Sequence, residues 1–149
     1  MNQSQSYKGL RLLCANALIA ALYVALTFTL PWLSFGMMQL RLSEALTVLP
    51  LFYPPSVVGL GVGCAVSNLV GFLTGANPIG LIDAAVGSAA TLLAALATLW
   101  IGRHIRRHHA RLLLGLMPPV LFNAAIVGAE LTVLFLDAFW LYFFLLGIG

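Results

Sequence analysis

The hydrophobic positions form long apolar runs, separated by short breaks of proline, glycine or polar residues. Six runs are predicted to be membrane helices, at residues 10–30, 40–53, 57–73, 79–101, a fifth from 112 onward and a short sixth after 137–140. A helix needs about 20 apolar residues to cross about 30 Å of hydrocarbon, whereas barrel strands alternate with period two over about ten residues. The expected fold is an all-α integral membrane protein, a bundle of six transmembrane helices in a single domain spanning residues 1–149.

Two of the six runs are short. The second, residues 40–53, would rise only about 21 Å as an α-helix, and Pro54-Pro55 ends it because proline disfavours helix continuation. We expect this run to be partly re-entrant or extended by residues 32–38. The sixth run has only roughly ten residues before Gly149. This predicts either that the fifth helix ends early or that the sixth helix is truncated.

Composition strengthens the membrane assignment. Of the 149 residues, 62% are hydrophobic and 7% are charged, and the mean hydropathy is +1.04. Soluble domains carry about 25% charged residues, so the composition excludes a water-soluble globular protein and leaves no room for a soluble catalytic domain. Cys14 and Cys64 lie inside apolar runs, without metal-ligand spacing or a disulfide framework. We expect both to be small packing residues.

The basic residues predict how the helices are oriented. Lys8 and Arg11 flank the first run, and four arginines and three histidines occupy residues 103–111 between the fourth and fifth runs. A dense basic run can bind nucleic acid, and clustered histidines can bind metal. Because this run joins two apolar runs, it is typical of a cytoplasmic loop. We expect no nucleic acid, metal or cofactor, and a multi-pass membrane protein with its N-terminus in the cytoplasm.

The stretch 41–50 carries an arginine and a glutamate in a sequence that is otherwise almost uncharged. Arg41 and Glu44 are three residues apart, so on a helix they lie on one face. Ionisable groups at a membrane span are costly and usually face a bundle interior or a cavity. Two interpretations stay open. Either the two residues line a small-molecule site, or they neutralise each other as a local structural pair.

Other polar residues occur inside the apolar runs. Asn68 either bonds to a neighbouring helix or contacts a ligand, and Asp83 either interacts with a helix dipole or faces a cavity. Asn123 and Glu130 are spaced to share a helix face. With the N-terminus inside, the charged residues of the predicted helices collect near the outer half of the bundle: Arg41, Glu44, Asp83 and Glu130. This convergence predicts a polar pocket that opens outward.

Small residues recur at every fourth position of the first run. Ala17, Ala21 and Ala25 form a stripe along one helix face. Such a stripe lets another helix approach closely. The partner is either a helix of this chain or a separate membrane subunit.

Several segments, taken in order, resemble one family. They are Arg-Leu-Ser-Glu-Ala-Leu-Thr-Val-Leu-Pro at 41–50, Gly-Leu-Gly-Val-Gly-Cys at 59–64 followed by Asn68, Asp83 with Gly-Ser-Ala-Ala-Thr-Leu at 87–92, and Pro-Pro-Val-Leu-Phe-Asn at 118–123 followed by Val-Gly at 127–128. Over roughly residues 10–145, the chain resembles the QueT family of substrate-binding S components of energy-coupling factor transporters. The first segment is specific and the others support it. A glycine–glutamate pair that we expect near the sixth helix, and a further stretch beyond, are absent.

The resemblance implies a bundle of six helices that binds a vitamin-like ligand from outside. It also implies a membrane-spanning coupling subunit and two cytoplasmic ATPases, with Ala17, Ala21 and Ala25 as the docking stripe. The chain has no GxxxxGK[ST] phosphate loop, so ATP would be hydrolysed elsewhere. The expected ligand is a queuosine precursor, a 7-deazaguanine such as preQ1 or preQ0, or queuine.

The chemistry of such a ligand suits carboxylates. A guanine-like edge presents two parallel N–H donors that one carboxylate can accept, and the cationic aminomethyl group of preQ1 pairs with a second. The hypothesis assigns these roles to Glu44 and Asp83, with Arg41 orienting Glu44. The remaining assigned contacts are Asn68 and Asn123 for polar atoms, and Trp140 or Phe52 for stacking on the ring.

Two alternatives remain open. The chain could be an S component or small transporter for another vitamin-like solute, or a structural membrane protein that transports nothing. An enzyme is not expected, because the sequence shows no Ser-His or two-Asp membrane protease pattern and no HExxH metal motif.

Overall fold

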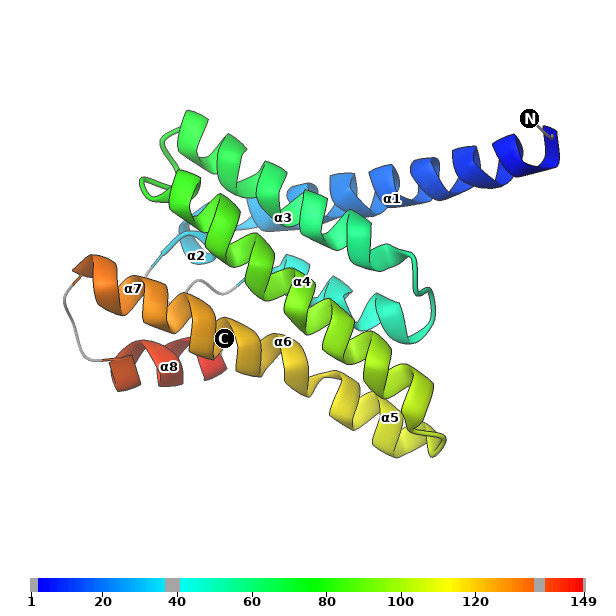
Figure 1. Cartoon of the computed structure of the whole chain (residues 1–149). Helices are drawn as coiled ribbons and strands as arrows, with labels where there is room; N and C mark the ends of the chain where they lie inside the picture. Colours follow the sequence, from blue (N-terminus) through cyan, green and yellow to red (C-terminus); the bar gives the residue numbers. More distant parts are fainter. Residues whose placement is uncertain (1–2, 37–40, 136–138, 149) are drawn as a thin grey trace.

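The structure, a computed structural model, describes residues 3–36, 41–135 and 139–148. Every regular element in these residues is helical, which confirms the predicted all-α class (Figure 1). The elements are α1 (Gln3–Thr29), α2 (Pro31–Ser34), the 3₁₀ helix η1 (Leu42–Leu51), α3 (Ser56–Leu73), α4 (Gly80–His104), α5 (His108–Gly115), α6 (Met117–Phe122), the π-helical turn η2 (Asn123–Val127), α7 (Gly128–Phe135) and α8 (Phe139–Ile148).

Four helical segments of the described residues are long and apolar enough to cross a membrane. They are Tyr7–Thr29, Ser56–Leu73, Gly80–His104 and His108–Leu134, and they match the first, third, fourth and fifth predicted runs. The count of six is not confirmed. The second run becomes η1, a 3₁₀ helix of 10 residues with Pro50 inside it, which rises only about 20 Å. Residue 40, where that run was predicted to begin, lies outside the described residues.

The sixth run becomes α8, which has 10 residues and packs against α7 and η2. An α-helix of this length rises about 15 Å, half the thickness of the hydrocarbon layer. The fifth run is continuous in its path but not in its geometry. It passes from α5 through α6 and a π-helical turn into α7. Its first break is at Leu116, two residues before Pro118 and Pro119. These two prolines supply no backbone N–H to the helix.

The helices are arranged with α3 and α4 at the centre, as Figure 1 shows. On one side α1 packs against α3, and on the other α6 and η2 pack against α4. The short helix η1 contacts α1, α3 and α4, and residues of η1 also line a cavity. The N-terminal part of α1 extends away from the other helices (Figure 1).

Two glycines of α3 allow α1 to pack closely. A Cβ atom at Gly63 would lie 2.7 Å from the Cβ of Tyr23, and one at Gly59 would lie 2.8 Å from the backbone oxygen of Asn16. The backbone N–H of Gly59 donates a hydrogen bond to Oδ1 of Asn16 over 2.8 Å. This bond ties the start of α3 directly to α1.

The interior holds two apolar clusters. Tyr23, Leu60, Cys64 and Ala95 form one of them between α1, α3 and α4. The second cluster lies where α4 meets the last helices, and its buried members are Ala90, Ala124, Val127, Leu131, Tyr142 and Leu146. Cys64 is buried, as predicted, whereas Cys14 is exposed on α1.

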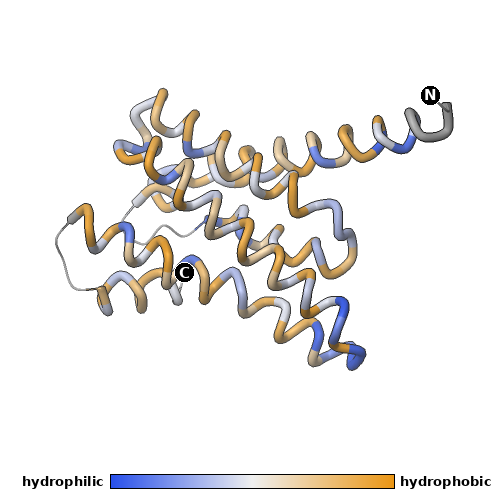
Figure 2. The backbone as a smooth tube through the Cα atoms, viewed as in Figure 1, coloured by the Kyte–Doolittle hydropathy of each residue, from blue (hydrophilic) through white to orange (hydrophobic). Residues whose placement is uncertain are grey.

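The outer surface is largely apolar, as a membrane environment requires. Leu18, Leu73 and Val133 are each more than 70% exposed. Hydrophilic residues gather in the loop between α4 and α5 at the right of Figure 2, on the side of the view where α1 begins. These are the segments whose basic residues predict a common membrane side.

Candidate functional site

An ion pair lies buried in the bundle. Nη2 of Arg41 is 2.8 Å from Oδ2 of Asp83, and the two side chains are 5% and 0% exposed. Arg41 directly precedes η1, and Asp83 lies in the first turn of α4. Two charges removed from water are tolerated only where their other hydrogen-bonding atoms are also engaged.

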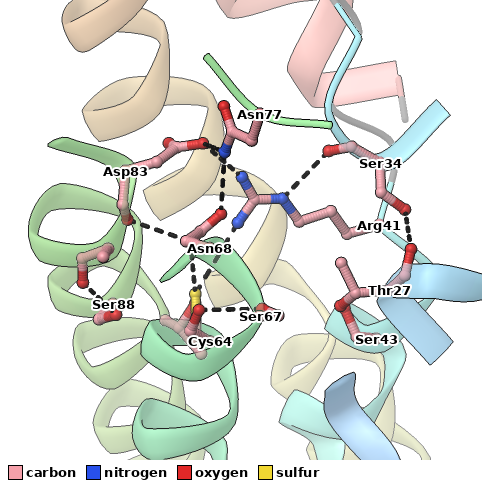
Figure 3. Close-up of polar contacts among 12 residues, drawn as sticks. Thr27, Ser34, Arg41, Ser43, Cys64, Ser67, Asn68, Asn77, Asp83 and Ser88 are labelled. Carbon is pink, nitrogen blue, oxygen red and sulfur yellow. Dashed lines mark hydrogen bonds and ion pairs between the residues drawn. The ribbon is translucent and has the colours of Figure 1, made fainter. Parts of the chain in front are cut away.

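A set of polar groups surrounds this ion pair (Figure 3). Nδ2 of Asn77 donates to Oδ2 of Asp83 over 2.9 Å, and Nδ2 of Asn68 donates to the backbone oxygen of Asp83 over 3.1 Å. The two asparagines are joined by a bond of 3.3 Å from Asn77 to Asn68. On the other side, Nε of Arg41 donates to the backbone oxygen of Ser34 over 3.3 Å. These bonds thus join four parts of the chain: the residue before η1, helix α3, the turn between α3 and α4, and helix α4.

The local backbone determines the direction of Arg41. Its φ of −105° and ψ of 110° are extended, so it lies outside the helix that begins at Leu42. The expectation that Arg41 and Glu44 share a helix face is therefore wrong, because an extended residue does not follow helical spacing. Its guanidinium instead reaches α4, where Gly87 leaves space. A Cβ at Gly87 would lie 3.6 Å from Nη1 of Arg41.

Glu44 forms a second polar centre at the contact between η1, α1 and α4. The hydroxyl of Tyr23 donates a short hydrogen bond to Oε1 of Glu44, and Oγ1 of Thr91 donates to the same oxygen over 3.3 Å. Oε2 of Glu44 is buried and has no hydrogen-bond partner among the described residues. A further bond of 2.8 Å from Thr27 to Ser43 joins η1 to α1. Glu44 thus keeps one oxygen able to accept from a ligand.

A cavity of about 350 Å³ opens beside these two centres. Arg41, Glu44 and Asn123 supply polar atoms to its wall, and Leu116, Met117 and Val120 are among its apolar lining residues. Asn123 begins the π-helical turn, a deformation that is frequent at functional sites. A smaller void of about 10 Å³ is also lined by Arg41, Glu44 and Asn123. The volume and lining are typical of a small-molecule site, which occupies roughly 300–1,000 Å³.

The polar residues assigned to ligand binding from the sequence fall into two groups. Arg41, Glu44 and Asn123 line the cavity. Asn68 and Asp83 are fully buried and belong to the polar network around Arg41, outside the cavity lining.

The assigned aromatic residues lie elsewhere. Trp140 is 64% exposed on α8, and Phe52 is 60% exposed. The ring of Phe52 lies 5.7 Å from the guanidinium of Arg111. Neither residue belongs to the cavity lining, so stacking on a ligand would require a different ring or a rearrangement.

Three polar residues of these centres were not singled out from the sequence. Asn77 directly precedes Pro78, a pair typical of a turn, and nothing in the sequence indicates that its side chain points inward. Tyr23 is not distinguished from its apolar run by any pattern, and Thr91 belongs to the family-like segment at 87–92 but had no role assigned to it. Their signal is positional, because Tyr23 lies on the face of α1 that packs against α3 and Thr91 lies one helical turn beyond Gly87.

The remaining predicted features are on the surface. Ala17, Ala21 and Ala25 are exposed on α1, so no helix in the described residues covers the whole stripe. No group of three potential metal ligands occurs among the described side chains.

Comparisons with known proteins match most of the chain. Residues 13–149 match the model of a family described as "QueT transporter". The queuosine precursor transporter QueT of Lactococcus lactis subsp. cremoris is 33% identical over 95 residues, which are 62% of this chain and 50% of that protein. The chain thus spans about half the length of this curated relative. No solved structure matches. Because the family model covers nearly all of it, the chain belongs to the QueT transporter family.

Proposed function

We propose that this chain is the membrane-embedded substrate-binding component of an energy-coupling factor transporter that takes up a queuosine precursor. The observation that carries the proposal is the cavity beside η1, where Glu44 retains a buried oxygen without a partner among the described residues. The family match and the printed name of the Lactococcus relative support this ligand class.

The ligand proposed for this cavity is a 7-deazaguanine. Its guanine-like edge carries parallel N–H donors, and a carboxylate is acceptor-only when ionised. Oε1 of Glu44 already accepts from Tyr23 and Thr91, so Oε2 is the oxygen left for the ligand. Charge-assisted bonds of this kind are the stronger ones, and the apolar side chains of the wall would cover the ring faces.

The other polar residues take supporting roles in the proposal. Asn123 lines the cavity and offers both a donor and an acceptor to the remaining polar atoms of the ligand. Asp83 is already bonded to Arg41 and Asn77. We therefore propose that Asp83 positions Arg41 and does not contact the ligand directly. Arg41 then presents its guanidinium to the cavity in a fixed position.

The proposed partners are a membrane-spanning coupling subunit and two cytoplasmic ATPases. The exposed stripe of Ala17, Ala21 and Ala25 is the proposed contact with the coupling subunit, because small residues allow close helix packing in a membrane. The basic loop at residues 103–111 supports a cytoplasmic location for that loop and for the N-terminus.

Ligand binding to the purified protein tests this function. Micromolar preQ1, preQ0 and queuine would each be added in detergent while thermal unfolding is followed, since a bound ligand raises the apparent stability. We expect saturable stabilisation by at least one 7-deazaguanine and none by thiamine, riboflavin or biotin. Saturation by one of those vitamins would support a transporter of another solute. No saturable response to any of them would support a structural protein.

A substitution connects the binding to the cavity. Glu44→Gln removes the charge of the accepting group, and we expect it to weaken 7-deazaguanine binding by about 1.5–3 kcal/mol, or roughly 10- to 150-fold. Glu130→Gln is the matched control, because it changes another buried acid that does not line the cavity. Equal affinities of the Glu44→Gln variant and the wild type would remove Glu44 from the site.

A further inference from the structure

Glu130 is a buried carboxyl group for which the proposed ligand site has no use. It lies in the first turn of α7 and is 8% exposed. Neither of its side-chain oxygens has a hydrogen-bond partner among the described residues. An ionised carboxylate in such a place is strongly unfavourable unless it is paired.

The neighbour of Glu130 is Asp83. Oδ2 of Asp83 is occupied by Arg41 and Asn77, whereas Oδ1 is buried and has no partner among the described residues. The two acids therefore contribute three unpartnered oxygens to one small region. A hydrogen atom placed between the two carboxyl groups would convert one of these oxygens into a donor and another into its acceptor.

The charges around Glu130 leave one negative charge uncompensated if both acids are ionised. Among the described residues, the charged groups that act on it are Asp83 and Arg41. The turn η2 has no titratable side chain. The one titratable side chain of α8 belongs to Tyr142, which is buried in the apolar cluster. One guanidinium balances one carboxylate. Two carboxylates that share a site rarely both ionise.

We propose that the carboxyl group of Glu130 is protonated and donates a hydrogen bond to Oδ1 of Asp83, so that the two residues form a proton-binding site inside the bundle. The carboxylate of Glu130 takes the proton from hydronium in the solvent, which leaves as water, so one O–H bond forms as another breaks. With the proton in place, Arg41, Asp83 and Glu130 have a net charge of zero. Asp83 remains ionised and keeps its contact with Arg41. The site does not require a ligand, so it stands independently of the proposed function.

Infrared spectroscopy of the purified, ligand-free protein tests the proposal directly. A protonated carboxylic acid has a carbonyl stretching band that a carboxylate lacks. We expect this band in the wild type at neutral pH, and we expect Glu130→Gln to remove it. Glu44→Gln is the control, because Glu44 also has a buried oxygen without a partner among the described residues. This variant should leave the band in place. A wild type without the band, or a band that Glu130→Gln leaves unchanged, would overturn the proposal.

Thermal unfolding gives a second measurement. The folded protein would hold a proton that the unfolded chain releases near neutral pH, so stability should fall as the pH rises. In Glu130→Gln the amide cannot ionise, and its melting temperature should depend less on pH and exceed that of the wild type at alkaline pH. The same pH dependence in both proteins would contradict the proposal. So would a melting temperature that rises with sodium or potassium in the wild type alone, because a bound cation would then occupy the place of the proton.

Discussion

Arg41 and Asp83 place two opposite charges where water does not reach, and each charge depends on the other. The pair is held in place by two further hydrogen bonds. The amide of Asn77 donates to the carboxylate, and the guanidinium donates to the backbone oxygen of Ser34. Removing one member of such a pair leaves an uncompensated buried charge, and this is more costly than removing both. The contribution of the ion pair to stability therefore depends on both charges being present together.

A double-mutant cycle should show this dependence. We expect Arg41→Met to lower the free energy of unfolding by about 3–5 kcal/mol, because Asp83 is left without its cation. Adding Asp83→Asn should restore part of the loss, with a coupling energy of about 0.5–3 kcal/mol. Unfolding in mixed micelles, followed by tryptophan fluorescence, measures both. Strictly additive losses would show that the two charges do not stabilise each other.

The sequence predicted which charged residues converge but not how they pair. Arg41, Glu44 and Asp83 could be singled out because charges are rare in this chain and expensive in a membrane. The partner of Arg41 could not be predicted, because the helical spacing that relates it to Glu44 requires a helix starting at or before Arg41. The backbone is extended there, and no local pattern in the sequence reports that conformation.

At the scale of elements, the close packing of α1 against α3 depends on the absence of a side chain at Gly63. Gly63 approaches Cβ of Tyr23, an atom that cannot rotate away. The same tyrosine donates to Glu44. The distance between α1 and α3 therefore also sets the position of the hydroxyl that bonds to the cavity-lining carboxylate.

Gly63→Ala should separate these helices. The added Cβ would lie 2.7 Å from the Cβ of Tyr23, so we expect a loss of about 1–3 kcal/mol in unfolding free energy and weaker ligand binding through the displaced tyrosine. Gly9→Ala is the matched control, because a Cβ at Gly9 meets nothing within 4 Å. Denaturant unfolding of the two variants gives the comparison. A Gly63→Ala protein as stable as the control would mean that the α1–α3 contact tolerates the methyl group.

Long elements were predictable from hydropathy and short ones were not. The runs at 57–73 and 79–101 appear almost unchanged as α3 and α4, since each alone satisfies the length that a membrane requires. The 3₁₀ geometry of η1 and the π-helical turn at Asn123 depend on contacts with several other elements. Hydropathy cannot distinguish these from α-helix, because all three are apolar segments of similar composition.

At the scale of the whole molecule, the charged residues that the structure describes divide into two regions. The basic residues lie in the first helix and the α4–α5 loop, while the buried ion pair and Glu130 lie near the opposite ends of α4 and of the last span. The cavity lies beside the second region, at η1. In the proposed orientation, a ligand would enter from outside, and α1 would carry the contact with the coupling subunit.

This division predicts that docking and ligand binding can be separated by mutation. Ala21 lies in the exposed stripe of α1, and Tyr23, on the buried face, bonds to Glu44. We expect Ala21→Phe to bind a 7-deazaguanine with wild-type affinity but to lose copurification with the coupling subunit and uptake into cells, because the larger ring keeps two helices apart. Val133→Phe, at a 74% exposed position of α7, is the control and should retain both activities. If Ala21→Phe transports normally, the contact with the coupling subunit lies on another face of the protein.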